Sequence, residues 1–225
     1  MTYIVLIASV LLGLVIALVL KPKTKLTQLL LSFSGAYLLA ITILHLLPEV
    51  FSSSMENKSL GFYILGGVLL QLILDFFSRG AEHGHIHVNT ENKIPFALLI
   101  SLSFHAFLEG LPLGHTHNHS HLLWAIVVHK IPIAIILATF LLNSNIPKLI
   151  TGTLLVGFSL MSPLGSFLGE SIPFLITYKT QITAVIIGVL LHISTIILFE
   201  TSKDHKFNLY KFISILLGMF IAFLA

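Results

Sequence analysis

The sequence has 225 residues, of which 56% are hydrophobic and only 9% are charged. Soluble domains carry roughly 25% charged residues, so this composition excludes an ordinary water-soluble protein and predicts an integral membrane protein surrounded by lipid. Cysteine is absent, which excludes disulfides, thiolate metal sites and cysteine nucleophiles. The net charge of +3 comes from basic residues scattered through short connections, and it gives no indication of nucleic-acid binding.

Apolar runs follow one another along the whole chain. A helix needs roughly 20 apolar residues to cross about 30 Å of hydrocarbon, and the runs have about this length. The first run lacks a basic leading segment and a cleavage site, so we expect it to be a true span. We predict an all-α bundle of eight transmembrane helices that forms one domain, residues 1–225, with spans at 3–20, 26–47, 60–78, 94–113, 122–142, 146–168, 181–199 and 207–225.

The basic residues indicate how these spans are oriented. Short cytoplasmic loops are enriched in lysine and arginine. Of the twelve basic residues, nine lie in or beside the connections after spans 1, 3, 5 and 7, and two lie in those after spans 2, 4 and 6. This asymmetry predicts that both termini lie outside the cytoplasm. The loop 79–93 is then cytoplasmic, and the loop 114–121 is external.

Histidine is unusually frequent, with twelve residues, and seven of them lie in these two loops. Imidazole is the commonest metal-ligating side chain, and histidine-rich tracts favour metal binding. We predict that the loop histidines capture metal ions loosely at the two mouths of the protein. They are His83, His85 and His87 in the first loop and His115, His117, His119 and His121 in the second.

Ionisable side chains also occur inside the predicted spans, where each costs at least roughly 2.5 kcal/mol to insert. His105 and Glu109 are four residues apart and therefore share one face of span 4. His129 of span 5 lies at a similar depth, roughly 10–12 Å below the outer end of its helix. We predict a buried metal site formed by these three residues. Auxiliary ligands are expected from His45, which is the first candidate for a fourth ligand, and from Glu49 and His192.

Two prolines and a lysine accompany this site. Pro112 and Pro132 cannot donate to the carbonyls four residues earlier, which lie beside Glu109 and His129. We expect helix breaks that expose these carbonyls to an ion, with a simple packing kink as the alternative. Lys130 is a fixed positive charge in the cation path, and we expect it to repel a second divalent ion. A lysine that extends to the outer interface is the alternative.

These residues resemble the ZIP (Zrt/Irt-like) family of divalent metal transporters over essentially the whole chain. The family's span 4 pattern, His-Asn-x-x-Asp/Glu-Gly, is matched by His105, Glu109 and Gly110. Its span 5 pattern, a ligand followed by x-x-Pro, is matched by His129 and Pro132. The sequence His-Leu-Leu-Pro-Glu at 45–49 is similar to the span 2 motif of the family. The resemblance implies a 3+2+3 arrangement of the eight helices and inward movement of the metal.

Three positions depart from the family pattern. Ala106 stands where an asparagine is frequent, Lys130 where an acidic residue is frequent, and Ile133 where histidine or glutamate is usual. The resemblance implies a two-metal centre in many members. We expect a single metal here, because the first two departures remove the second site and the third removes one ligand of the first.

The function predicted from this pattern is uptake of a divalent metal across the cell membrane, with Zn²⁺ as the first candidate and Fe²⁺, Mn²⁺ or Cd²⁺ as others. Two alternatives stay open. The first alternative is an intramembrane metal-dependent hydrolase, because a His₂Glu zinc site with an open water position is catalytic in soluble enzymes. The second alternative is a metal sensor that binds metal without transporting it. No His-Glu-x-x-His motif occurs, so we expect no enzyme. The expected partners are the metal ion, the bilayer and a second copy in a homodimer, and no nucleic acid.

Overall fold

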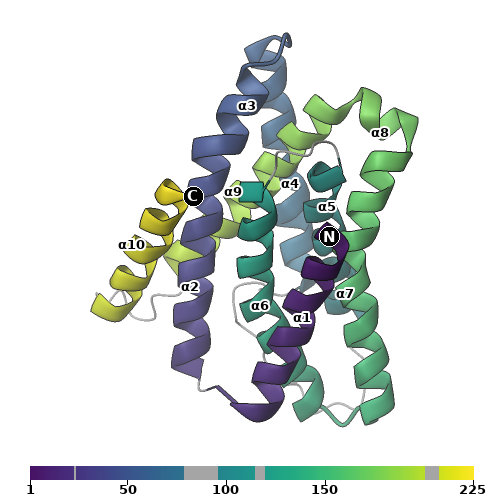
Figure 1. The fold of residues 1–225 in the computed structure, drawn as a ribbon, viewed down its shortest axis with the longest axis vertical. Coiled ribbons are helices and arrows are strands. Elements are labelled where there is room, and N and C mark those ends of the chain that lie inside the picture. Colours follow the sequence, from purple (N-terminus) through teal and green to yellow (C-terminus); the bar gives the residue numbers. More distant parts are fainter. Residues whose placement is uncertain (23, 79–95, 115–119, 201–207) are drawn as a thin grey trace.

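The computed structural model describes residues 1–22, 24–78, 96–114, 120–200 and 208–225. In this part of the chain, helices follow one another along most of its length (Figure 1). They are α1 (Thr2–Val19), α2 (Thr24–Ile41), the π-helix η1 (Thr42–Leu46), α3 (Leu47–Phe51), α4 (Asn57–Ser78), α5 (Phe96–Gly110), the 3₁₀-helix η3 (Leu111–Gly114), α6 (Ser120–Asn143), α7 (Lys148–Ser171), α8 (Pro173–Thr177), α9 (Lys179–Glu200) and α10 (Leu209–Leu224).

Seven helical segments among the described residues are long and apolar enough to cross a membrane. The eighth predicted span, 207–225, forms α10, which has only 16 residues. At a rise of 1.5 Å per residue such a helix is about 24 Å long, less than the hydrocarbon thickness of about 30 Å. The eight predicted runs therefore all form helical segments, and the last of them is the shortest when α5 is counted together with η3.

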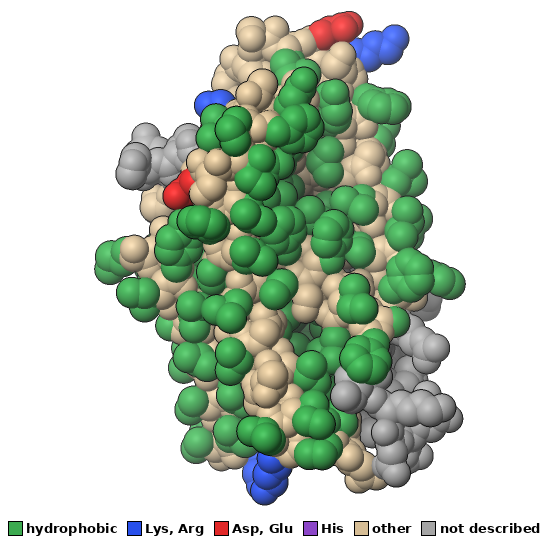
Figure 2. Space-filling model, turned by 90° about the vertical axis from the view of Figure 1, so that its right-hand side faces the viewer, with side chains coloured by type: hydrophobic (Ala, Val, Ile, Leu, Met, Phe, Trp, Pro, Cys, Tyr) green, Lys and Arg blue, Asp and Glu red, His purple; other side chains and the backbone are tan. Residues whose placement is uncertain are grey.

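The surface has the composition that lipid requires. Many large apolar side chains are exposed, such as Phe62 at 75% and Phe76 at 79%. A water-soluble monomer rarely exposes apolar patches this extensive. Figure 2 shows one face of the molecule on which hydrophobic side chains cover the middle, whereas charged side chains lie toward the top and at the bottom edge. This distribution fits a molecule whose long axis crosses the bilayer, with its apolar middle in the hydrocarbon and its charged ends in water.

The second predicted span is longer than expected and contains a local irregularity. Residues Thr24–Phe51 form one apolar helical segment of 28 residues, in which η1 separates α2 from α3. The N–H of Leu47 donates to the carbonyl of Thr42, five residues earlier. Pro48 follows directly and would clash with the carbonyl of Leu44 in a regular α-helix, so widening this turn relieves the clash. His45 lies inside the widened turn.

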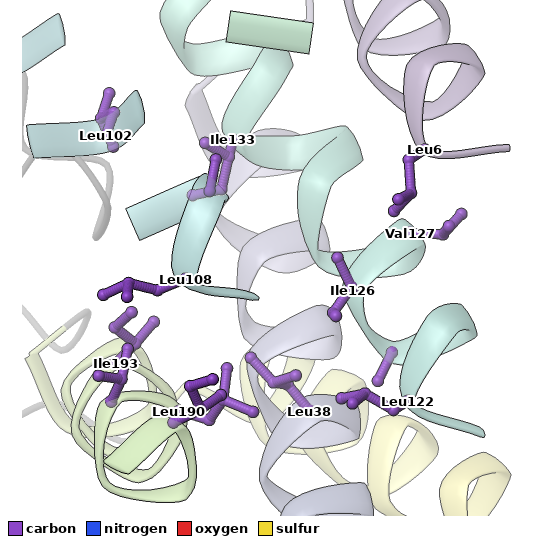
Figure 3. Close-up of a cluster of buried hydrophobic side chains, with 14 of the residues drawn as sticks. Leu6, Leu38, Leu102, Leu108, Leu122, Ile126, Val127, Ile133, Leu190 and Ile193 are labelled. Atoms are coloured by element: carbon purple, nitrogen blue, oxygen red, sulfur yellow. The ribbon is translucent and has the colours of Figure 1, made fainter. Parts of the chain in front are cut away.

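The main helix pairs are α2 with α10, α4 with α9, α1 with α6, and α5 with α7. Buried aliphatic side chains from α1, α2, α5, α6 and α9 meet between these pairs, as the close-up in Figure 3 shows for residues such as Leu6, Leu38, Leu102, Ile126 and Leu190. In a bilayer such packing, rather than the exclusion of water, holds neighbouring helices together. The core therefore joins the helices that carry the candidate site.

Glycines allow α5 and α7 to approach closely. A Cβ at Gly110 would collide with the carbonyl oxygen of Ser162, and a Cβ at Gly165 would collide with that of Phe107. The hydroxyl of Ser162 also donates to the carbonyl of Ala106. Close backbone approach through small residues is typical of membrane helices. This contact fixes the depth and rotation of α5, which carries two of the predicted metal ligands.

Candidate metal centre

The α5 helix carries His105 and Glu109 one turn apart and buries both of them. The two side chains are 4% and 1% exposed, and His105 Nε2 lies 2.9 Å from Glu109 Oε1. The helix ends at Gly110, directly after Glu109, and continues as the 3₁₀-helix η3, which contains Pro112. The local spacing in the sequence thus produces the paired side chains, and the change of helix type follows them immediately.

The α6 helix brings His129 to the same place. Its imidazole is buried, and its Nδ1 lies 3.4 Å from the hydroxyl oxygen of Ser34 on α2. That hydroxyl donates to the carbonyl of Leu31 at 3.0 Å, which leaves its lone pairs free to accept from Nδ1–H. In this arrangement Nε2 of His129 keeps its lone pair for a metal. A partner that orients the second ring nitrogen in this way is the usual environment of a metal-ligating histidine.

His105, Glu109 and His129 each place a ligand atom within 4.8 Å of the other two, and all three are buried. Within the described ranges this is the one group of three or more such side chains that could hold a metal ion. A tetrahedral zinc with bonds of about 2.0–2.2 Å holds its ligands about 3.4 Å apart. The separations of these three atoms differ from that value by about 1.4 Å at most, so small side-chain movements would suffice for them to bind one ion.

The helices α5 and α6, which carry the site residues, pack against different neighbouring helices. Packing of α5 is mainly against α7 and α4, and packing of α6 is mainly against α1 and α2. Among the described residues, α5 and α6 do not form one of the closely packed pairs. The site therefore joins side chains from two helices whose backbones make few contacts with each other.

Lys130 also points into the site. It is 2% exposed, and its ammonium donates to Glu109 Oε2 at 3.1 Å. The same nitrogen lies 5.6 Å from the centre of the Phe158 ring on α7, within range of a cation–π interaction. The sequence indicated a charge near the cation path, but the pairing with Glu109 itself is visible only in the structure. Ile133, one turn further along α6, is buried and offers no ligand.

The auxiliary ligands predicted from the sequence lie elsewhere. His45 stacks on His121 at the start of α6, with ring centres 4.5 Å apart and planes inclined by 8°. Glu49 is exposed on α3, and His192 is half-buried on α9. None of these three belongs to the group formed by the core residues. His45 thus lies outside the group that the three core residues form, and a fourth ligand from His45 stays a prediction.

The remaining predicted features divide in two. The helix changes to 3₁₀ geometry at Pro112, whereas α6 runs through Pro132 without interruption. Pro132 therefore lies inside a continuous helix, and the break expected from the sequence does not occur there. The loop histidines His83, His85, His87, His115, His117 and His119 lie outside the described residues.

Ser34 is the participant that sequence reasoning missed. It lies in the run Ser-Phe-Ser of α2, and small polar residues in a membrane helix usually serve helix packing. The sequence did contain a signal, because Ser34 lies in the same predicted span as His45, a candidate ligand, and can therefore face the interior of the bundle as well. Nothing in the sequence alone assigns it to His129, which is 95 residues away.

Fold and site together define a polytopic helical membrane protein with a buried cluster of metal-ligating side chains. A sequence model described as ZIP zinc transporter matches residues 80–225, well over half of the chain. The chain therefore belongs to the ZIP family of zinc transporters.

Individual relatives match shorter stretches. The chain is 37% identical to the zinc transporter ZIP1 of Takifugu rubripes over 94 residues, which are 39% of this chain and 31% of that protein. It is 36% identical to protein zntD of Dictyostelium discoideum over 107 residues, 40% of this chain and 16% of that protein. It is 32% identical to the zinc transporter ZIP1 of Plasmodium falciparum (isolate 3D7) over 135 residues, 57% of this chain and 38% of that protein. The matched stretches thus span well under half of the length of these relatives.

Proposed function

We propose that this protein transports a divalent metal cation, with Zn²⁺ as the first candidate, through a single buried site formed by His105, Glu109 and His129. The observation that carries the proposal is the meeting of three buried ligand atoms within 4.8 Å inside a bundle of helices that are long and apolar enough to cross a membrane. Two imidazole nitrogens and one carboxylate oxygen suit zinc, and water can complete the shell. Fe²⁺, Mn²⁺ and Cd²⁺ are further candidate substrates.

The surroundings of the site support a path across the membrane. On one side, the stacked pair His45 and His121 lies between the end of the second span and the start of α6. At the opposite ends of α2 and α6 lies a cavity of about 280 Å³, whose lining includes Thr27, Gln28 and Asn143. A route between α2 and α6 would pass from the histidine pair through the core site to this cavity, where Thr27, Gln28 and Asn143 are polar groups in a mainly apolar lining. Such groups offer a partly dehydrated cation replacement oxygen and nitrogen ligands.

The direction of transport rests on the orientation of the helices. The excess of basic residues in connections after odd-numbered spans supports extracytoplasmic termini. The resemblance to the ZIP family supports an eight-span arrangement of the 3+2+3 type, with α10 as the eighth span. In this orientation the histidine pair faces outward, and the cavity opens toward the cytoplasm. We propose inward movement in the cell membrane by a single transmembrane domain, residues 1–225. A homodimer is a further proposal.

The decisive experiment is zinc uptake into proteoliposomes that enclose a fluorescent zinc reporter. Wild-type protein should load the vesicles, and Glu109→Ala should not. Glu170→Ala is the matched control, because Glu170 is an exposed carboxylate of α7. Metal binding by the wild-type protein without any flux would contradict transport and favour the metal sensor. Full uptake by Glu109→Ala would contradict the assignment of the site.

A further inference from the structure

We propose that Lys130 is a tethered cation that holds one oxygen of Glu109 permanently away from the transported metal. In this role it lowers the affinity of the site and biases the site toward cations that need few oxygen ligands. The inference rests on the proposed transport site, and it concerns which metals that site accepts and how readily it releases them. It makes Lys130 a determinant of specificity rather than only a charge that excludes a second ion.

The geometry divides the carboxylate of Glu109 between two partners. Oε1 lies 2.9 Å from Nε2 of His105, and Oε2 lies 3.1 Å from Nζ of Lys130. All three side chains are almost completely buried, so water does not compete for either oxygen from bulk solvent. Phe158 faces the ammonium at 5.6 Å and covers it from the side of α7. The lysine is therefore held by a carboxylate and an aromatic ring together.

This division restricts how the carboxylate can bind a metal. An ion between His105, Glu109 and His129 reaches Oε1, whereas Oε2 is occupied by Lys130. Monodentate binding suits a four-coordinate zinc with two imidazoles and one water. Mn²⁺, Mg²⁺ and Ca²⁺ prefer six or more ligands that are mostly oxygen, and a bidentate carboxylate is a common way to supply them. Lys130 therefore penalises these ions more than it penalises zinc.

The charge of Lys130 acts on every divalent ion. With neutral imidazoles, the carboxylate and the ammonium cancel, so the bound site carries the full +2 of its metal. Without the lysine it would carry +1. Like charges repel strongly in a buried environment, where the dielectric is low. A transport site must also release its ion, and this repulsion favours release. Removing the charge is expected to tighten binding and to slow the maximal flux.

The test compares binding of Zn²⁺ and Mn²⁺ to purified full-length protein in detergent, by competition with a fluorescent chelator. The loop histidines are replaced by serine in every variant, so that binding reports the buried site. Lys130→Met is expected to tighten Zn²⁺ binding at least tenfold and to tighten Mn²⁺ binding by a larger factor. Lys130→Gln should act in the same direction, and Lys130→Arg, which keeps the charge, should change both affinities less than either. In proteoliposomes, Lys130→Met should lower the maximal zinc flux.

Two further variants separate the possible failures. Lys211→Met removes another poorly exposed lysine, which donates to the carbonyl of Leu198 at 2.7 Å on α9, and it should change neither affinity. Glu109→Gln should lose tight zinc binding. If Glu109→Gln binds zinc as wild type does, the proposed site is wrong. A different outcome overturns only the inference about Lys130. In that outcome Glu109→Gln loses tight zinc binding, but neither Lys130→Met nor Lys130→Gln changes the metal affinity or the preference for Zn²⁺ over Mn²⁺. Circular dichroism and size-exclusion profiles establish that each variant is folded, and either neutral variant suffices for the comparison.

Discussion

Replacing Glu109 by glutamine should destabilise the protein as well as stop transport. At 3.1 Å and an effective dielectric of 20, the attraction between the Lys130 ammonium and the Glu109 carboxylate is about 5 kcal/mol. Removing one partner of a buried ion pair leaves the other charge without compensation, which typically costs about 3–5 kcal/mol. We therefore expect Glu109→Gln to lower the free energy of unfolding by about 3–5 kcal/mol.

The double variant Glu109→Gln/Lys130→Met provides the sharpest comparison. Replacing both members of a buried pair by uncharged groups is often nearly neutral, so its stability should return to within about 1 kcal/mol of wild type. Its zinc uptake should remain absent, because the carboxylate ligand is still missing. Stability and transport are thus expected to separate: the single variant loses both, and the double variant recovers only stability.

The assay is unfolding by sodium dodecyl sulfate in mixed micelles, followed by circular dichroism, together with zinc uptake into proteoliposomes. Glu170→Gln is the control, and as an exposed substitution it should change stability by no more than about 0.5 kcal/mol. The reasoning would be refuted by a Glu109→Gln variant as stable as wild type, or by a double variant no more stable than the single one. Uptake at the wild-type rate by either variant would refute the role of Glu109 in transport.

The other predictions concern topology, stoichiometry, packing and the loops. Single cysteines at Ser120 and Asn89 should react from opposite sides of the membrane, with position 120 reached from outside by an impermeant reagent; labelling from one side would contradict the orientation. Metal analysis of protein without its loop histidines should give one tight ion per chain, and two ions would disprove the single site. Gly188→Val should lower the free energy of unfolding by about 1–3 kcal/mol, because a Cβ at this position collides with the carbonyl of Ile64. Gly66→Val should be nearly neutral, because no other helix of the described part of the chain lies within reach of a Cβ at that position. Equal effects of the two substitutions would contradict the packing. The external loop histidines are the last target, and each is replaced by serine: His115, His117, His119 and His121. This variant should bind zinc with weaker apparent affinity and keep most of its maximal flux. Loss of flux from a folded variant would place a core ligand among these histidines.

Features that depend on one helix alone followed from the sequence. The apolar runs predicted the membrane helices, because a segment of this length and hydrophobicity must satisfy its own backbone hydrogen bonds in lipid. The spacing of His105 and Glu109 placed both on one face of α5, since residues four apart in a helix are neighbours whatever surrounds them. Matching depths in two consecutive spans then suggested His129 as their partner. The length of α10 and the π-helix at His45 were not foreseen, because helix ends and local irregularities depend on small energy differences.

Features that depend on two helices were decided only by the tertiary structure. Which side chains meet across a gap depends on the rotation, tilt and depth of each helix, and these are set by packing contacts such as those of Gly110 and Gly165 between α5 and α7. This is why the structure pairs His45 with His121, joins Ser34 to His129, and directs Lys130 to Glu109. A helical period fixes neighbours within a helix, but it carries no information about which face of another helix stands opposite.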